Sequence, residues 1–250
     1  MERMRAQREW MKSVFGTFPP GASDQSQGKS EPPIEKACPP NAELVALPPP
    51  DTSVLTQPEL RACMASRRSR RHWSHVFMSK EELSFLLWAT QGVQEVVGEG
   101  YATIRTVPSG GARHAFETYL IVNRVDGLLP AVYRYRPVQH ELLFLFGTDT
   151  LLEHLNAAVF GQRFVNDASI VFVWTCVPYR GEWRYGPAAH KLMLIDAGHV
   201  CQNLYLACEG IGAGTCAVAA YDQDALDRLL QLDTHEEFSI YLAPVGKRTE

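Results

Sequence analysis

Four arginines and a serine stand together in the segment Arg67-Arg68-Ser69-Arg70-Arg71. An arginine guanidinium presents a planar fork of donors that matches the oxygens of a phosphate, and a serine hydroxyl adds one more donor. We therefore interpret Arg67, Arg68, Ser69 and Arg71 as a phosphate grip at the end of a predicted helix. A solvated basic patch that complements the helix dipole is the alternative.

The loop Pro108-Ser109-Gly110-Gly111 is the second candidate for chemistry. Its glycines allow left-handed backbone angles and a close approach of the backbone to a ligand. Ser109 offers a hydroxyl beside free amides, and Arg105, Arg113 and His114 place positive or ionisable groups nearby. Such a loop can hold a flat, polar, partly anionic molecule, although an ordinary surface turn has the same composition.

Two further segments are candidates for ligand binding. One is a run of small residues, Ala217-Val218-Ala219-Ala220, and the other is the basic segment Gly246-Lys247-Arg248 near the end of the sequence. A phosphate grip, a glycine loop for a flat ring and a strand of small residues together fit flavin mononucleotide (FMN). Gln91, near the end of a predicted helix, could hydrogen-bond a ligand ring, or it is simply a polar helix end.

Three other chemistries fit less well. His72 and His75 are the only close pair of histidines and have no third ligand in view, so we expect no metal site. Ser109, His199 and Asp196 suggest a hydrolase triad, but the chain has no G-x-S-x-G motif and the loop precedes its strand. The sequence also lacks the glycine motifs of Rossmann and P-loop nucleotide sites.

Composition describes an ordinary globular protein of 250 residues, with 46% hydrophobic and 21% charged residues. A net charge of -4 argues against a nucleic-acid binder. No apolar run is long enough to cross a membrane, and the basic N-terminus has no continuous apolar core, so we expect neither a span nor a secretory signal. Six cysteines without a C-x-x-C spacing favour reduced thiols and a cytoplasmic location.

The N-terminal stretch differs in composition from the rest of the chain. Residues 1–16 predict a short amphipathic helix, and residues 17–50 are rich in Pro, Ser, Gly and Gln. Such a composition cannot bury a core of its own. We therefore predict an extended arm over residues 1–46, which we expect to cross to a partner subunit, and a folded domain over residues 47–250.

Hydrophobic periodicity predicts the elements that position the candidate residues. Capping boxes at Thr56-Gln57-Pro58-Glu59 and Ser79-Lys80-Glu81-Glu82 predict two helix starts. The longest helix is expected from Ala188 to Glu209, after a polar loop at Trp183-Arg184-Tyr185-Gly186. Strands are predicted over Thr118–Val122, Ala131–Tyr135, Glu141–Phe146, Ser169–Val177, Thr215–Ala220 and Phe238–Ala243. This order suggests an α+β or α/β sandwich.

Several of these segments, taken in order, resemble the nitroreductase superfamily and, more narrowly, its SagB-type branch, which includes flavin-dependent azoline dehydrogenases. The matching motifs are R-R-S-R-R, L-L-W-A-T-Q-G-V, R-T-V-P-S-G-G-A-R-H, D-A-G-H-V-C-Q-N-L-Y-L-A and the closing P-V-G-K. They cover about residues 47 to 248 and are specific as a set.

The resemblance implies an α+β fold, a three-layer sandwich around a mixed, mainly antiparallel sheet, in an obligate homodimer with FMN at each of two subunit interfaces. It implies that the phosphate grip is completed by Gly246, Lys247 or Arg248, and that Gln162 lies near the ribityl chain or ring edge. Pro108, Ser109 and Gly110 would come from the partner subunit, and amides around Ala219 and Ala220 would face flavin N5. His199 would then be structural.

The implied activity is an oxidoreductase with ping-pong hydride transfer through flavin N5, NADH or NADPH being a candidate donor and the substrate a small molecule or a peptide. The azoline dehydrogenases have a Lys-Tyr pair where this chain has Arg184-Tyr185. Arginine is a poor base because it keeps its proton at neutral pH, so Tyr185 is the better candidate of the two. An azoline dehydrogenase and a flavin-binding or flavin-processing protein without nicotinamide turnover stay open as alternatives.

Overall fold

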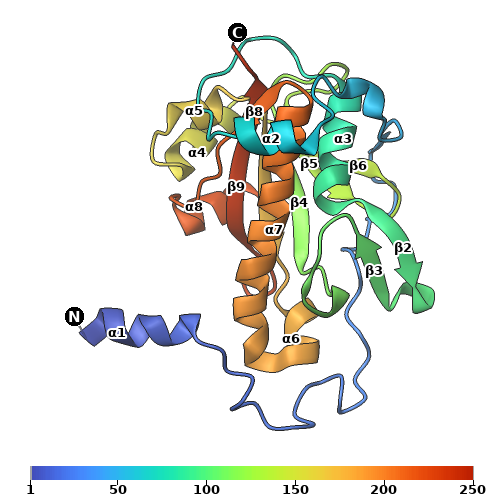
Figure 1. Ribbon diagram of the computed structural model, residues 1–250, viewed down its shortest axis with the longest axis vertical. Coiled ribbons are helices and arrows are strands. Elements are labelled where there is room, and N and C mark those ends of the chain that lie inside the picture. Colours follow the sequence, from blue (N-terminus) through green and yellow to red (C-terminus); the bar gives the residue numbers. More distant parts are fainter. Residues whose placement is uncertain (1, 250) are drawn as a thin grey trace.

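The computed structural model describes residues 2–249 and contains a seven-stranded sheet in the order β1-β6-β5-β4-β7-β9-β8 (Figure 1). Its strands are β1 Leu44–Ala46, β4 Phe116–Val122, β5 Ala131–Arg136, β6 Glu141–Phe146, β7 Ile170–Cys176, β8 Ala213–Thr215 and β9 Phe238–Lys247. Every pairing between these strands is antiparallel. Parallel pairing occurs only in isolated bridges at Ser69–Thr215 and Met78–Val125 within the described residues. The predicted hairpin and the predicted central strand are thereby confirmed.

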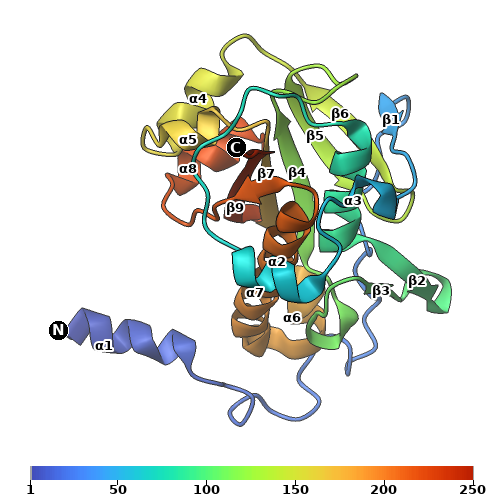
Figure 2. The same ribbon diagram turned by 45° about the horizontal axis from the view of Figure 1, so that its top comes forward.

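Helices cover both faces of this sheet, whereas α1 projects away from it (Figure 1). The helices are α1 Glu2–Arg8, α2 Leu60–Ser66, α3 Lys80–Gln91, α4 Leu151–Ala158, α5 Arg163–Asn166, α6 Tyr179–Tyr185, α7 Ala189–Gly210 and α8 Gln223–Leu229. Figure 2 shows α4, α5 and α8 on one side of the sheet and α2, α3 and α7 on the other. The expected three-layer α+β sandwich is confirmed.

The two central strands, β4 and β7, are buried along their whole length. Because side chains alternate between the faces of a strand, an all-apolar strand needs cover on both sides. Leu120 and Phe172 are opposite each other and pack toward α3 and α7, whereas Ile121 and Val173 belong to the core beneath α4 and α8. The unbroken apolar sequence of β7 therefore explains its central place.

Helix α7 is confirmed over nearly its predicted range, and α3 begins at the predicted capping box. Ser79 accepts a hydrogen bond from the Glu82 amide while the Glu82 carboxylate accepts one from the Ser79 amide. The capping box predicted at Thr56 is wrong, because α2 begins only at Leu60 and the Thr56 hydroxyl donates to the Gly210 carbonyl instead. Proline at position 58 holds this segment extended before the helix.

Three local predictions need correction. The segment Trp183-Arg184-Tyr185 is not a loop but the last turn of α6, which ends at Gly186. The strand predicted over Thr215–Ala220 stops at Thr215, and only Val218 bridges β9 beyond it. A hairpin of β2 (Val93–Val97) and β3 (Ala102–Arg105) forms a separate two-stranded sheet that sequence patterns did not mark, because its outer residues are exposed.

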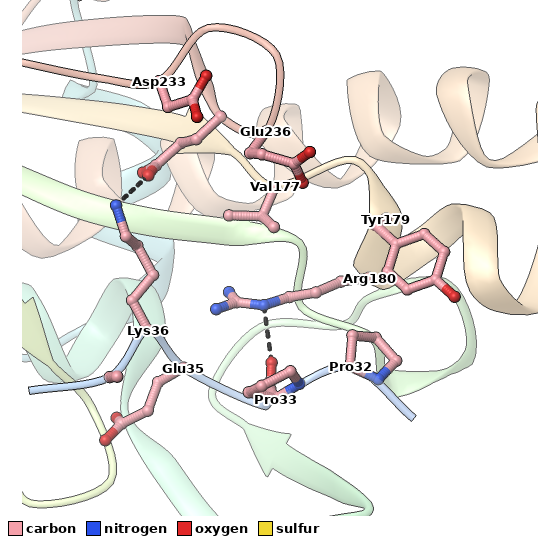
Figure 3. Close-up of a pocket in the computed structure, with 11 residues that line it drawn as sticks. Pro32, Pro33, Glu35, Lys36, Val177, Tyr179, Arg180, Asp233 and Glu236 are labelled. Atoms are coloured by element: carbon pink, nitrogen blue, oxygen red, sulfur yellow. Dashed lines mark hydrogen bonds and ion pairs between the residues drawn. The ribbon is translucent and has the colours of Figure 1, made fainter. Parts of the chain in front are cut away.

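Helix α1 projects from the rest of the molecule, and the part of the N-terminal arm that follows it lies against the folded part of the same chain (Figure 1). Buried arginines from three elements hold the extended backbone at residues 33–37. Arg180 donates to the Pro33 carbonyl, Arg105 to Ile34 and Arg134 to Ala37. Figure 3 shows the first of these contacts beside a pocket of about 390 Å³ between the arm and the domain.

The division at residue 46 and the crossing of the arm to a partner stay predictions. Met1 and Glu250, the outer ends of the two predicted ranges, lie outside the described residues. Within the part of the chain that the structure describes, no helix is long and apolar enough to cross a membrane.

Candidate functional site

The arginine segment leaves α2 and runs beside the end of β8. Helix α2 stops at Ser66, and Arg67 already has an extended backbone. The Arg70 amide then donates to the Thr215 carbonyl at 2.9 Å, and Ser69 forms a parallel bridge with Thr215. This pairing places the phosphate-grip residues next to the segment of small residues, which begins just after Thr215.

Several cations near this segment are already paired with acidic side chains, two of them with Glu209, a buried carboxylate on α7. Arg70 and Arg248 both form ion pairs with Glu209, whose side chain is 2% exposed. Lys247 is paired with Glu82. These three cations therefore support the structure around the pocket rather than adding uncompensated charge to it.

A pocket of about 370 Å³ opens over this segment. It is lined by Arg68, Ser69, Arg70, Arg71, His72, Arg248 and Thr249. Arg68 and Arg71 form no ion pair with a carboxylate among residues 3–249. Arg68 donates only to the backbone carbonyls of Ala65 and Arg67 within this range. Two guanidinium groups without an acidic partner, beside a serine hydroxyl, form the donor set that an anionic group such as a phosphate requires.

Tyr205 of α7 connects the arginine segment to the small residues. Its hydroxyl lies 3.1 Å from the Ser69 hydroxyl and accepts a hydrogen bond from the Ala217 amide at 2.9 Å. The Arg67 guanidinium stacks over its ring at 5.4 Å from the ring centre. Sequence reasoning missed Tyr205, because a tyrosine inside an apolar helix pattern carries no mark of a site.

Gln162 borders the same region from the other side. Its amide nitrogen donates to the Ala220 carbonyl at 2.7 Å and to Val159 at 2.9 Å. Two residues further on, the ring of Phe164 lies 5.6 Å from the Arg71 guanidinium. Ala219 and Ala220 are exposed, so the structure brings the arginine segment, Gln162 and these small residues to one surface.

Gly246 and Gln91 occupy positions away from that surface. Gly246 is buried in β9, where a Cβ would lie 2.9 to 3.0 Å from atoms of Trp73. Gln91 is 1% exposed and accepts a hydrogen bond from Arg105 at 3.0 Å in the interior. Neither residue lines the pocket over the arginine segment.

The glycine loop lies at the other end of α7 and is anchored by Asp196. The Asp196 carboxylate accepts hydrogen bonds from the Ser109 hydroxyl at 2.8 Å and from the Gly110 amide at 2.9 Å. The Ser109 hydroxyl oxygen in turn accepts one from the His114 amide at 3.0 Å. Pro108 is exposed beside them. These bonds tie the loop to α7 and to its own backbone.

Tyr185 and Arg184 sit directly on this loop. Gly111 has a φ of 61°, and the Tyr185 hydroxyl occupies the space that a Cβ at Gly111 would need. The Arg184 side chain reaches the Gly111 carbonyl at 3.5 Å, and its guanidinium lies 5.4 Å from the centre of the Tyr185 ring. Glycine is thus required here both for its backbone angle and for the close approach of the phenol.

Positive charge and burial act together behind the loop. Burial, together with Arg105, Arg113 and Arg180, each of which repels a protonated imidazole, lowers the pKa of His114 to about 3. His114 is therefore neutral at pH 7, and the positive field around the loop comes from arginines alone.

Two groups of candidate residues are thus separated along α7. The loop group contacts Asp196 and the arginine group contacts Tyr205, nine residues later, which corresponds to about 13 Å along a helix. Just before Asp196, α7 presents Leu194 and Ile195, which are 62% and 47% exposed.

Comparison with known proteins decides the family. Residues 64–247 match the nitroreductase family. The chain belongs to the nitroreductase family.

Individual relatives agree with this assignment. A protein of Methanocaldococcus jannaschii named as a nitroreductase is 31% identical over 192 residues, which cover 77% of this chain and 92% of that protein. The trifolitoxin-processing protein of Rhizobium leguminosarum bv. trifolii is 30% identical over 133 residues, 52% of this chain and 36% of its own length. This second relation supports the SagB-type branch.

A solved structure has a similar fold. A crystal structure of a nitroreductase-type protein from Ralstonia eutropha superposes with a TM-score of 0.67 at 24% identity, covering 88% of this chain and 99% of that one. The fold expected from the motifs is confirmed by this likeness.

Proposed function

We propose that this member of the nitroreductase family is an FMN-dependent oxidoreductase that acts as a homodimer. The observation that carries the proposal is the separation of the two residue groups along α7. A two-fold axis across the exposed face of α7 would place the loop group of one subunit beside the arginine group of its partner. Each of two sites would then combine the parts that a single chain keeps about 13 Å apart.

The residues present fit the phosphate of FMN. Arg68 and Arg71 supply uncompensated positive charge, and Ser69 supplies a hydroxyl at the same pocket. Tyr205 holds the Ser69 hydroxyl in place. Lys247 and Arg248, which the resemblance adds to the grip, would contribute through the field around the pocket because acidic partners already bind them.

The other residues would orient the ring system and control protons. Exposed backbone at Ala219 and Ala220 offers hydrogen-bonding groups without side chains to obstruct a ring. The glycine loop would cover the ring from the partner subunit, and Tyr185 offers a hydroxyl at the surface of that loop. Bound FMN would supply reversible hydride transfer at N5, and a nicotinamide donor and an acceptor would use the same opening in turn, which gives ping-pong kinetics.

A second candidate function, oxidation of a peptide azoline ring, is favoured by one specific observation. Tyr185 is held against the glycine loop, where its phenol could exchange a proton with a substrate. The sequence relation to a trifolitoxin-processing protein points in the same direction. Arg184 would then orient Tyr185 and attract negative charge rather than act as a base.

The first test is the visible spectrum of the purified protein before and after anaerobic addition of NADH or NADPH. Flavin bands that bleach with either donor support the oxidoreductase. Flavin bands that persist favour a substrate-derived hydride or a flavin-binding protein without nicotinamide turnover. Absence of flavin bands after addition of FMN would refute the cofactor assignment.

Variants locate the site. Ser69→Ala and Arg71→Gln should each weaken FMN binding by about tenfold or more, because each removes a charge-assisted hydrogen bond to the phosphate. Arg61→Gln, at an exposed arginine of α2 outside the pocket, is the matched control and should leave the affinity unchanged. Equal losses in all three variants would indicate a general charge effect instead of a phosphate site.

A further inference from the structure

The N-terminal arm follows the short helix α6, which carries Arg184 and Tyr185. The Tyr179 hydroxyl donates to Asp24 at 2.9 Å. The Trp183 carbonyl accepts from the Gln25 amide at 2.8 Å, and the Trp183 indole donates to the Lys29 carbonyl at 3.0 Å. Arm backbone and side chains therefore contact α6 at both of these positions.

Two aromatic residues of the arm reach the end of α6. The ring of Phe15 lies 5.8 Å from the ring of Tyr185 at an interplanar angle of 75°, an edge-to-face contact. Phe18 packs against Gly186, where a Cβ would come within 2.5 Å of the Phe18 ring. Gly186 has a φ of 50°, so this turn needs a glycine for its angle and for the space that Phe18 fills.

The hydroxyl end of Tyr185 lies at the glycine loop. It takes the space above Gly111, and the Arg184 side chain lies beside it. Tyr185 thus contacts both Phe15 of the arm and Gly111 of the loop. Helix α6 has only seven residues and ends at Tyr185, so no further turn of this helix follows the residue.

We propose that Phe15 is a positioning residue that fixes the Tyr185 hydroxyl at the glycine loop, with Phe18 fixing the turn behind it. The proposal rests on the proposed function, in which that loop covers the flavin. It gives the arm a role at the site from within its own chain. Phe15 contacts Tyr185 and not the arginine segment proposed to hold the FMN phosphate, so loss of Phe15 should lower turnover and leave FMN affinity little changed.

Trp10 provides a matched control within the same arm. It is also aromatic, it is 73% exposed against 47% for Phe15, and within the described residues it makes no aromatic contact with α6. A Trp10→Ala variant removes a large apolar side chain from the arm without touching Tyr185. Phe15→Tyr keeps the ring and should behave like the wild-type protein.

The first experiment needs no cofactor. Hydrogen–deuterium exchange of the full-length protein without added FMN should show faster exchange over residues 179–186 in Phe15→Ala than in wild type. Trp10→Ala and Phe15→Tyr should match the wild-type rate. Unchanged exchange in Phe15→Ala overturns the proposal, because it shows that the ring contact holds nothing in place.

The second experiment uses the FMN-loaded protein, with NADH or NADPH as donor and menadione or nitrofurazone as acceptor. Phe15→Ala should lower kcat about three- to tenfold with little change in FMN affinity, and Tyr185→Phe should have the same effect. The double variant should lose little more than either single variant, because both act through one hydroxyl. Independent losses that multiply, or a Tyr185→Phe variant as active as wild type, overturn the proposal. Failure of the wild-type protein to bind FMN refutes the proposed function instead, and hydrogen exchange still reports the contact.

Discussion

Lowering the pH from 7 to 5 should destabilise this protein through His114. The side chain is 5% exposed, and burial together with Arg105 lowers its pKa from the usual 6.5 to about 3. Between about pH 3 and pH 6.5, His114 binds a proton in the unfolded chain and stays neutral in the folded chain. Stability is therefore fully present above about pH 6.5 and falls as the pH falls toward 3.

The magnitude follows from the two pKa values. In the interval between them, the free energy of unfolding changes by about 1.4 kcal/mol per pH unit, and from pH 7 to pH 5 this group alone costs about 2 kcal/mol. Carboxylates that titrate in the same range add their own pH dependence, so a variant is needed to isolate the histidine.

His114→Asn supplies that comparison. Position 114 has a φ of 43°, which asparagine tolerates better than most residues, and asparagine does not titrate. Urea unfolding at pH 7 and pH 5 should show a loss about 2 kcal/mol smaller in His114→Asn than in the wild type, whatever the absolute stability of the variant. Equal losses in the two proteins would falsify the assignment of a neutral, buried His114.

Two further predictions concern the elements around the site. Asp196→Ala should lower the free energy of unfolding by about 1–3 kcal/mol, measured in urea, because it leaves the Ser109 hydroxyl and the Gly110 amide without their acceptor. His199→Ala, on the exposed side of the same carboxylate, is the control. Equal losses in the two variants would contradict the role of Asp196 as the anchor of the loop. Arg180→Met should lower the free energy of unfolding by about 3–5 kcal/mol, because it leaves the buried Glu117 carboxylate without its cationic partner. Adding Glu117→Gln should recover part of this loss. A double variant less stable than Arg180→Met would show that the arginine stabilises the protein mainly through its contact with the arm.

Local sequence signals predicted the main elements well where one physical cause dominates. The apolar run at Ile170–Cys176 can be satisfied only by burial on both faces, and the capping box at Ser79 closes with its own backbone. The same kind of signal failed at Thr56, because the amides of Thr56 and Gln57 donate to a distant group, the Gly210 carbonyl, and α2 begins only at Leu60. A local sequence pattern therefore predicts an element correctly unless a group distant in sequence forms a competing hydrogen bond.

The candidate site shows the same division. Residue types predicted a phosphate grip at Arg67–Arg71, since guanidinium and hydroxyl groups carry that chemistry wherever they stand. Which of the arginines stay free depends on Glu209, more than a hundred residues away in sequence, and on its pairing with Arg70 and Arg248. Gln91 looked available at a helix end, yet the fold buries it against Arg105.

The sequence by itself determined the family, the order of the elements and the chemical types of the candidate residues. These depend on motifs, on hydrophobic period and on side-chain chemistry, all of which are local. Only the tertiary structure decided that Tyr205 joins the arginine segment to the small residues, and that Phe15 and Gly111 enclose Tyr185. Such contacts join segments far apart in the chain, and packing, rather than any single segment, selects them.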